Sequence, residues 1–211
     1  MKLESMETVK TYRGKALIAD PIYQYIWFTV PSSDLPPEKT EKDLIDSPWL
    51  QRLRRIYQLQ SARWVYPAAE HTRFQHSLGT MHMAGEFGRH LYPGLKETFS
   101  ETPSINFIEE LLRVGGLLHD VGHGPYGHFF DDHFLSQYDL THEILGQKII
   151  TDKLGHLIKD ISRSPSGVFG EGECLDPEQI AFLIRKPGGW KRRAARMALL
   201  FKAAFFRRLY R

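Results

Sequence analysis

Residues 118–125 combine side chains that together can bind a metal ion and activate water. The segment reads Leu-His-Asp-Val-Gly-His-Gly-Pro, so His119 and Asp120 are adjacent and a turn follows them. Imidazole and carboxylate groups are common ligands of divalent metals in hydrolytic sites. Nine of the ten histidines of this 211-residue chain lie within residues 71–142. The pattern therefore predicts a metal-dependent hydrolase.

His119 and Asp120 need a particular local geometry to reach one ion. Neighbouring residues of an α-helix point about 100° apart, but Gly122 follows the pair and lets the chain relax at a helix end. His76, on the preceding predicted helix, would approach the pair if the two helices pack antiparallel. The three side chains would still need a fourth ligand and water to complete a catalytic site. The alternative interpretation makes His119 a C-terminal helix cap and Asp120 a turn residue.

Apolar residues recur at helical spacing through much of the chain and predict a mainly α fold with a small β element near the N-terminus. Residues 15–30 are rich in β-branched and aromatic types and predict one or two short strands. The Ser47-Pro48 pair predicts the start of a helix, whose apolar spacing continues to Leu59. Further helices are predicted over residues 72–91, 105–119, 126–137, 141–158 and 177–186.

The predicted helix over residues 105–119 should be the central one. It is apolar on nearly all sides, which is typical of a helix buried on every face. Gly115 and Gly116 lower its helix propensity, so we expect them to allow close packing against a neighbouring helix.

The composition is that of an ordinary soluble domain, with 42% hydrophobic and 25% charged residues. We predict an N-terminal extension over residues 1–16, one domain over residues 17–188 and a basic, apolar tail over residues 189–211. Cys174 is the single cysteine, and no apolar run matches a signal peptide or a membrane span of roughly 20 residues. We therefore expect a cytoplasmic protein.

Several blocks of sequence resemble one known family. They are Asp20-Pro21-Ile22, residues 44–59, residues 65–79, residues 118–128 and Thr141-His142-Glu143. In this order they resemble the HD-domain phosphohydrolases, and most of all the branch of deoxynucleoside triphosphate (dNTP) triphosphohydrolases. The likeness covers about residues 17–187 and implies an HD-domain helical bundle.

The resemblance assigns roles to individual residues. It implies that a divalent metal (Mg²⁺, Mn²⁺, Fe²⁺ or Zn²⁺) is held by His76, His119 and Asp120. It places catalytic or phosphate-contacting groups at His142, Glu143, Arg73, His123 and His128, with His142 as the candidate general acid. It also implies a regulatory nucleotide site at Asp46, Gln51, Arg52 and Arg54, although arginines on a solvated helix need no ligand.

The chemistry of two of these side chains supports their roles independently. Arg73 precedes His76 by three residues, so both share a helix face, and a planar guanidinium suits a phosphate beside a metal. A histidine such as His142 can protonate a leaving oxygen near neutral pH.

The resemblance implies that water attacks the α-phosphorus of a dNTP and releases deoxynucleoside and triphosphate. The partner is then a nucleotide, and a homo-oligomer is expected by resemblance alone. Two alternatives remain open within this fold: a non-catalytic nucleotide-binding or regulatory module, and an HD phosphodiesterase that acts on another nucleotide. A third, a nucleic-acid-binding protein, would depend on the basic tail.

The chain departs from the family pattern after residue 178. The family supplies a fourth metal ligand from a downstream aspartate, whereas no Asp or Glu follows Glu178 here. Asp131, Asp132 and Asp139 lie nearest the motif, and their spacing selects none of them. We therefore expect a weaker metal site and reduced or absent catalysis relative to a full-length relative.

The tail has three interpretations. Residues 190–211 carry eight Lys or Arg and no Asp or Glu, so they account for more than the whole net charge of +3. Such a segment could contact anionic lipid or nucleic acid. Out-of-frame sequence is also often basic, and here the change of composition coincides with the end of the family likeness.

Overall fold

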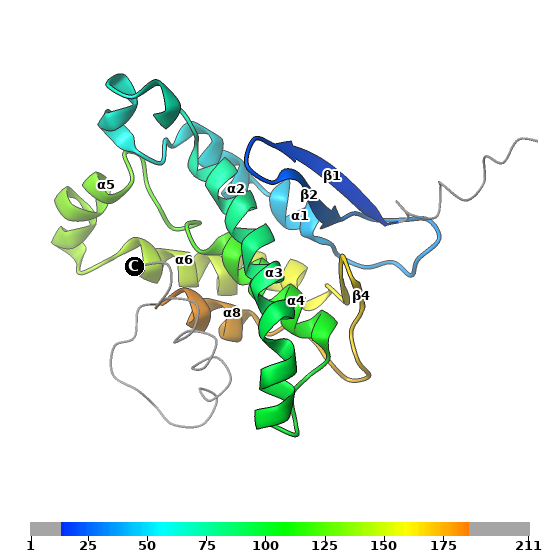
Figure 1. Ribbon diagram of the computed structural model, residues 1–211. Coiled ribbons are helices and arrows are strands. Elements are labelled where there is room, and N and C mark those ends of the chain that lie inside the picture. Colours follow the sequence, from blue (N-terminus) through cyan, green and yellow to red (C-terminus); the bar gives the residue numbers. More distant parts are fainter. Residues whose placement is uncertain (1–13, 186–211) are drawn as a thin grey trace, which may run out of the picture.

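The computed structural model describes residues 14–185, and Figure 1 shows their arrangement. The predicted basic tail over residues 189–211 and most of the predicted N-terminal extension lie outside the described residues. The fold is mainly helical with a small N-terminal hairpin, as predicted, and it contains a second small antiparallel hairpin that was not predicted. The strands and α-helices of the first half are β1 (Lys15–Asp20), β2 (Gln24–Thr29), α1 (Glu41–Ile45), α2 (Pro48–Gln51), α3 (Arg73–Thr98) and α4 (Ile105–Leu118).

The second half of the described chain continues with short helices and one hairpin. The predicted helix over residues 126–137 is divided in two, and the one over residues 141–158 contains a π-helical turn. The elements are α5 (His128–His133), η5 (Leu135–Tyr138), α6 (His142–Ile149), η6 (Ile150–Leu154), α7 (Gly155–Lys159), β3 (Arg163–Ser164), β4 (Gly167–Val168) and α8 (Pro177–Ile184). No helix among residues 14–185 is both long and apolar enough to cross a bilayer.

Helices α3 and α4 form an antiparallel pair at the centre of the molecule (Figure 1). Thr72 caps α3 because its side chain accepts a hydrogen bond from the amide of Gln75. A Cβ added to Gly116 would lie 2.8 Å from the carbonyl oxygen of Thr80, whereas one added to Gly115 would meet only the Leu183 side chain, at 3.4 Å. The predicted close packing is therefore confirmed at Gly116, where the two helix backbones touch.

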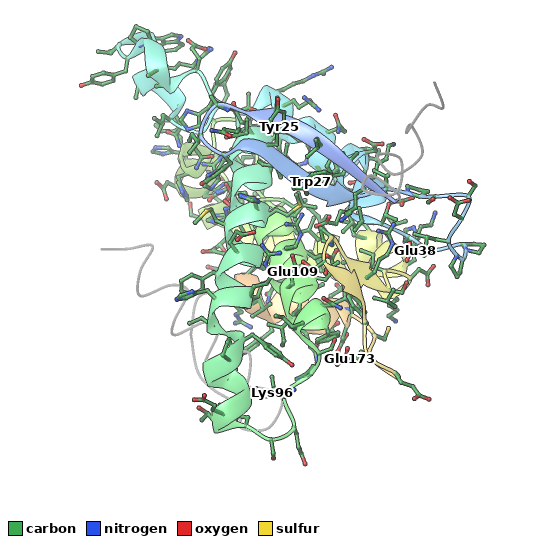
Figure 2. All side chains as sticks on the ribbon, turned by 45° about the vertical axis from the view of Figure 1, so that its right-hand side comes forward. Tyr25, Trp27, Glu38, Lys96, Glu109 and Glu173 are labelled. Carbon is green, nitrogen blue, oxygen red and sulfur yellow. The ribbon has the colours of Figure 1, made fainter. Side chains whose placement is uncertain are left out.

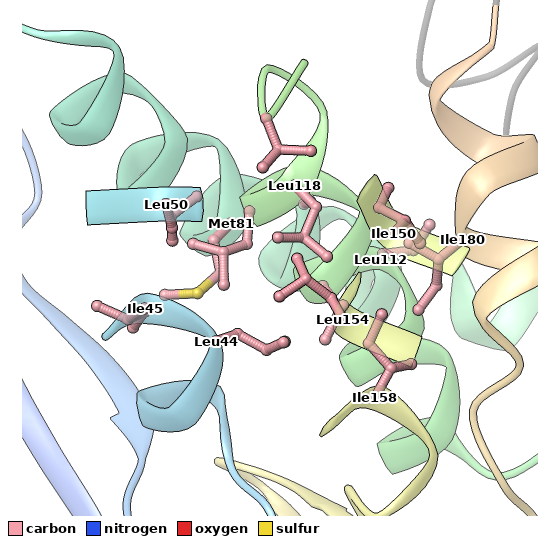
Figure 3. Close-up of a cluster of buried hydrophobic side chains, with 14 of the residues drawn as sticks. Leu44, Ile45, Leu50, Met81, Leu112, Leu118, Ile150, Leu154, Ile158 and Ile180 are labelled. Atoms are coloured by element: carbon pink, nitrogen blue, oxygen red, sulfur yellow. The ribbon is translucent and has the colours of Figure 1, made fainter. Parts of the chain in front are cut away.

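The apolar core joins elements from both halves of the chain. Leu44 of α1, Met81 of α3 and Leu118 of α4 belong to one buried cluster, with Ile150 and Ile180 on its other side (Figure 3). Each of these side chains is buried. Burying such a side chain contributes roughly 1.5–3 kcal/mol relative to leaving it in water, so this cluster holds α3 and α4 in one arrangement.

Helix α4 also carries charge into the core, which the sequence analysis did not predict. Glu109, Glu110 and Arg113 are all buried. The Arg113 guanidinium donates to Glu41 at 2.7 Å, and Ser164 of β3 donates to Glu109 at 2.8 Å. Figure 2 labels Glu109 on α4. These contacts compensate the burial of Arg113 and Glu109, whereas the Glu110 carboxyl has no hydrogen-bond partner among the described residues. The helix is therefore buried on nearly all sides although it is not apolar on all sides.

The predicted helix from Ser47 ends earlier than its apolar spacing suggested. After α2 the chain forms a short 3-10 helix, η2 (Arg52–Arg55), and Ile56 is extended. Two further 3-10 helices follow, η3 (Gln60–Trp64) and η4 (Pro67–Ala69). The prediction of helical spacing to Leu59 is wrong because the Ile56 carbonyl instead accepts the amide of Arg73. This contact attaches η2 to the first turn of α3.

Candidate metal and phosphate site

The structure brings together the three residues predicted as metal ligands. His76 lies in the first turns of α3, and His119 and Asp120 follow the last residue of α4. The Nε2 atoms of His76 and His119 are 3.1 Å apart, and Nε2 of His119 is 3.2 Å from Oδ1 of Asp120. One nitrogen or oxygen from each residue lies within 4.8 Å of the others. The antiparallel pairing of α3 and α4 creates this proximity.

The donor chemistry of this triad fits a divalent cation. Nδ1 of His119 is 2.7 Å from the Gly116 carbonyl, so Nδ1 carries the proton and Nε2 is left as a bare ligand atom. Burial, followed by the neighbouring His119, lowers the pKa of His76 to about 4, so this ring is neutral at pH 7. Burial raises the pKa of Asp120, but the adjacent histidines and Arg73 outweigh it and hold the pKa well below its usual range. The triad thus offers the neutral His76 ring and the ionised Asp120 carboxylate, and Nε2 of His119 faces both.

Arg73 completes the metal end of the site. Its side chain is 2% exposed, and Nη1 donates to Oδ2 of Asp120 at 2.6 Å. Among the described residues its buried Nε has no hydrogen-bond partner. An arginine that is anchored by one nitrogen and free at another can still bind an anion.

A second cluster lies directly beside the triad. It consists of His123, His128, Asp131 and His142, whose ligand atoms lie within 4.8 Å of one another. His142 Nδ1 is 2.5 Å from Oδ2 of Asp131, and the rings of His123 and His142 stack with centroids 3.8 Å apart. His123 joins the two clusters, because its Nε2 is 3.5 Å from Asp120 and its Nδ1 is 3.6 Å from Asp131. The residues predicted to bind metal and those predicted to bind phosphate therefore form one continuous site.

Asp131 is the site residue that sequence reasoning did not assign. It was one of three aspartates near the motif, considered only as a substitute metal ligand. The structure places it in α5, where its carboxylate faces three histidines and not the metal triad. Spacing from His128 was the available signal, since the two are three residues apart and share a helix face. Glu143, also predicted, lies 3.6 Å from Nε2 of His142.

The four residues predicted as a regulatory nucleotide site lie on or beside α2 and η2. Asp46 pairs with Lys42, and the Gln51 amide donates to the Ile45 carbonyl at 2.8 Å. The Arg54 guanidinium stacks over the Phe74 ring at 3.8 Å. Arg52 points inward and donates to backbone carbonyls beside the metal triad. The regulatory role stays a prediction.

Comparison with known proteins agrees with this geometry. The profile of the HD domain family matches residues 73–184, which is the segment that contains every side chain of the two clusters. This chain belongs to the HD domain family.

This HD domain protein is similar to proteins of several organisms. It is 34% identical over 159 residues to the uncharacterised protein MJ1154 of Methanocaldococcus jannaschii, a match that covers 72% of this chain and 31% of the relative. It is 33% identical over 180 residues to the deoxynucleoside triphosphate triphosphohydrolase SAMHD1 of Homo sapiens, a match that covers 81% of this chain and 26% of the relative. The deoxynucleoside triphosphate triphosphohydrolase SAMHD1 of Gallus gallus is 42% identical over 149 residues, a match that covers 69% of this chain and 23% of the relative. The HD domain chain thus spans about a third or less of the length of these relatives.

Proposed function

We propose that this HD domain is a metal-dependent phosphohydrolase whose substrate is a dNTP, hydrolysed to deoxynucleoside and triphosphate. The observation that carries the proposal is the continuity of the two clusters through His123. A triad suited to a divalent cation and a set of imidazoles lie close enough to act on one phosphate. The substrate class rests on the likeness to the dNTP triphosphohydrolases.

A bound divalent metal would polarise a phosphate oxygen and increase the acidity of water at the triad. Arg73 would hold the Asp120 carboxylate through Nη1 and place its positive charge beside the phosphate. Attack of a water oxygen on the α-phosphorus forms a new P–O bond and breaks the bond to the 5′ oxygen of the deoxyribose. That oxygen leaves as a hydroxyl after it takes up a proton, while the water's own proton passes to solvent.

His142 is the group best placed to supply that proton. Oδ2 of Asp131 lies 2.5 Å from Nδ1 of His142 and accepts from it, so Nε2 is the atom from which His142 would donate. Glu143 lies 3.6 Å from the same Nε2 and helps to orient it. Because the metal triad found among residues 14–185 has three members, we expect weaker metal binding than in a four-ligand site.

The test is a phosphorus NMR time course of the full chain with mixed dNTPs and Mg²⁺ or Mn²⁺, run beside Asp120→Ala. We expect inorganic triphosphate to appear only with the unsubstituted chain. Release of a monophosphate instead would identify a phosphodiesterase. Absence of turnover in a folded chain that still binds nucleotide would contradict the proposal and identify a non-catalytic module.

A further inference from the structure

The side chain of Arg52 reaches from η2 to the loop that carries the metal ligands. Its Nη1 donates to the carbonyl of His123 at 2.5 Å, and its Nη2 donates to the carbonyl of Val121. These carbonyls flank Gly122 and directly follow Asp120. One guanidinium therefore bridges two backbone groups on either side of the sharpest part of the loop.

The side chains of this loop are held by Arg73 on Asp120, by the His142 ring on His123 and by burial of Val121, so the contribution of Arg52 is to the backbone. The loop's own backbone bonds are short-range, from the Val121 amide to Leu118 and from the His123 amide to Asp120. On the opposite side it packs tightly against α6, where a Cβ on Gly122 would lie 1.9 Å from the His142 carbonyl. The loop is thus held between α6 on one side and the two hydrogen bonds of the Arg52 guanidinium on the other.

A planar guanidinium is well suited to make both of these bonds at once. Two N–H donors on separate nitrogens of a rigid plane match two carbonyls, whereas a lysine ammonium has to reach both from a single nitrogen. Arg52 itself makes none of the contacts within the metal triad or the histidine cluster. Both of its terminal nitrogens are occupied by the loop, and its buried Nε has no hydrogen-bond partner among the described residues.

We propose that Arg52 is a positioning residue for the metal site. By fixing the carbonyls of Val121 and His123 it sets the direction of the Asp120 carboxylate toward His76 and His119. Through the same bonds it sets the distance between His123 and Asp120. The proposal rests on the metal site of the proposed function, but it concerns ligand geometry and not turnover.

The experiment measures binding of Co²⁺ alone, with no nucleotide present. The full chain, Arg52→Lys and Arg52→Gln are titrated with Co²⁺ and followed by visible absorption, which reports the ligand geometry. Arg55→Lys is the matched control, because Arg55 lies on the same helical turn and is exposed. Cooperative unfolding of each metal-free variant, followed by circular dichroism, shows that it folds.

Loss of a residue that orients metal ligands typically weakens metal affinity by about 10- to 100-fold. We expect a loss of that size and an altered absorption band in both Arg52 variants, and neither change in Arg55→Lys. Unchanged Co²⁺ affinity and spectrum in the Arg52 variants would overturn this proposal alone, as would loss of nucleotide binding at unchanged Co²⁺ affinity. Loss of cooperative unfolding in both variants would make Arg52 a folding residue and overturn it too. Failure of the unsubstituted chain to bind Co²⁺ would overturn the proposed function as well.

Discussion

Asp131 controls the proton positions of the histidine cluster in this site. It accepts from His142 Nδ1 and lies 3.5 Å from His128 Nδ1. In Asp131→Asn an amide can present its NH₂ to His142 and favour the wrong tautomer, so we expect turnover to fall by about 10²- to 10⁴-fold. Metal affinity should stay unchanged, because Asp131 lies outside the triad. Triphosphate release and Co²⁺ titration measure the two effects.

The neighbouring Asp132→Asn is the control, since Asp132 is exposed on the same helix. It should retain full turnover. A drop in Co²⁺ affinity in Asp131→Asn would contradict this assignment and make Asp131 a metal ligand.

At the scale of single residues, the sequence predicted which residues belong to the site better than it predicted which residues they contact. The blocks around His76, His119 and His142 could be recognised because their types and order are informative by themselves. The choice among Asp131, Asp132 and Asp139 depends on how α5 is oriented, and no local pattern encodes that orientation. Arg52 could not be distinguished from a surface arginine, because its partners lie 69 and 71 residues away in the sequence.

At the scale of elements, the distance between α3 and α4 sets the metal site. Gly116 lets the α4 backbone approach Thr80 of α3, one turn after His76. In Gly116→Ala the added methyl group must push the helices apart, so we expect a loss of about 1–3 kcal/mol in the free energy of unfolding. We also expect weaker Co²⁺ binding, because His76 moves away from His119. Urea unfolding and Co²⁺ titration test both.

Gly115→Ala is the matched control for this substitution. Its methyl group would meet only Leu183 at an ordinary 3.4 Å contact, and alanine raises helix propensity by as much as about 1 kcal/mol. It should leave Co²⁺ binding unchanged. Equal loss of Co²⁺ affinity in the two variants would show that helix separation is not the cause.

Elements were predictable where local chemistry decides them. The Ser47-Pro48 pair was sufficient to place a helix start, and the β-branched and aromatic residues over 15–30 were sufficient to place the strands of the first hairpin. The end of the helix at Arg55 was not predictable from local chemistry. It depends on the Ile56 carbonyl, which accepts a hydrogen bond from the amide of the distant Arg73. Long-range hydrogen bonds overrode helical spacing there.

At the scale of the whole molecule, buried charge makes stability depend on pH. Burial raises the pKa of Glu110 well above 4.5, and the nearby Glu41 carboxylate adds to this effect. The folded state therefore holds this proton more tightly than the unfolded state. The contribution to stability is complete below about pH 4.5 and is lost as the pH rises through the folded pKa.

Glu110→Gln removes this dependence because glutamine stays neutral. Relative to the unsubstituted chain, its unfolding free energy should rise by about 1.4 kcal/mol per pH unit above the unfolded pKa, up to the folded pKa. Urea unfolding from pH 4 to pH 8 measures the difference in unfolding free energy between Glu110→Gln and the unsubstituted chain. The contributions of the other titrating groups cancel in this difference. The exposed Glu101→Gln should give a flat difference over the same range. A flat difference for Glu110→Gln would show that its carboxyl is ionised in the fold.

Metal binding should stabilise the whole fold, because its ligands come from segments 43 residues apart. A ligand at about 100 times its dissociation constant adds about 2.7 kcal/mol, which for a domain of this size raises Tm by about 5–10 °C. EDTA should reverse the shift in differential scanning calorimetry.

His119→Gln and Asp120→Asn should both abolish the metal-induced shift in Tm. Only Asp120→Asn should also lower the metal-free stability, by about 3–5 kcal/mol, because it leaves the buried Arg73 without its carboxylate. A shift that persists in both variants would place the stabilising ion outside the triad.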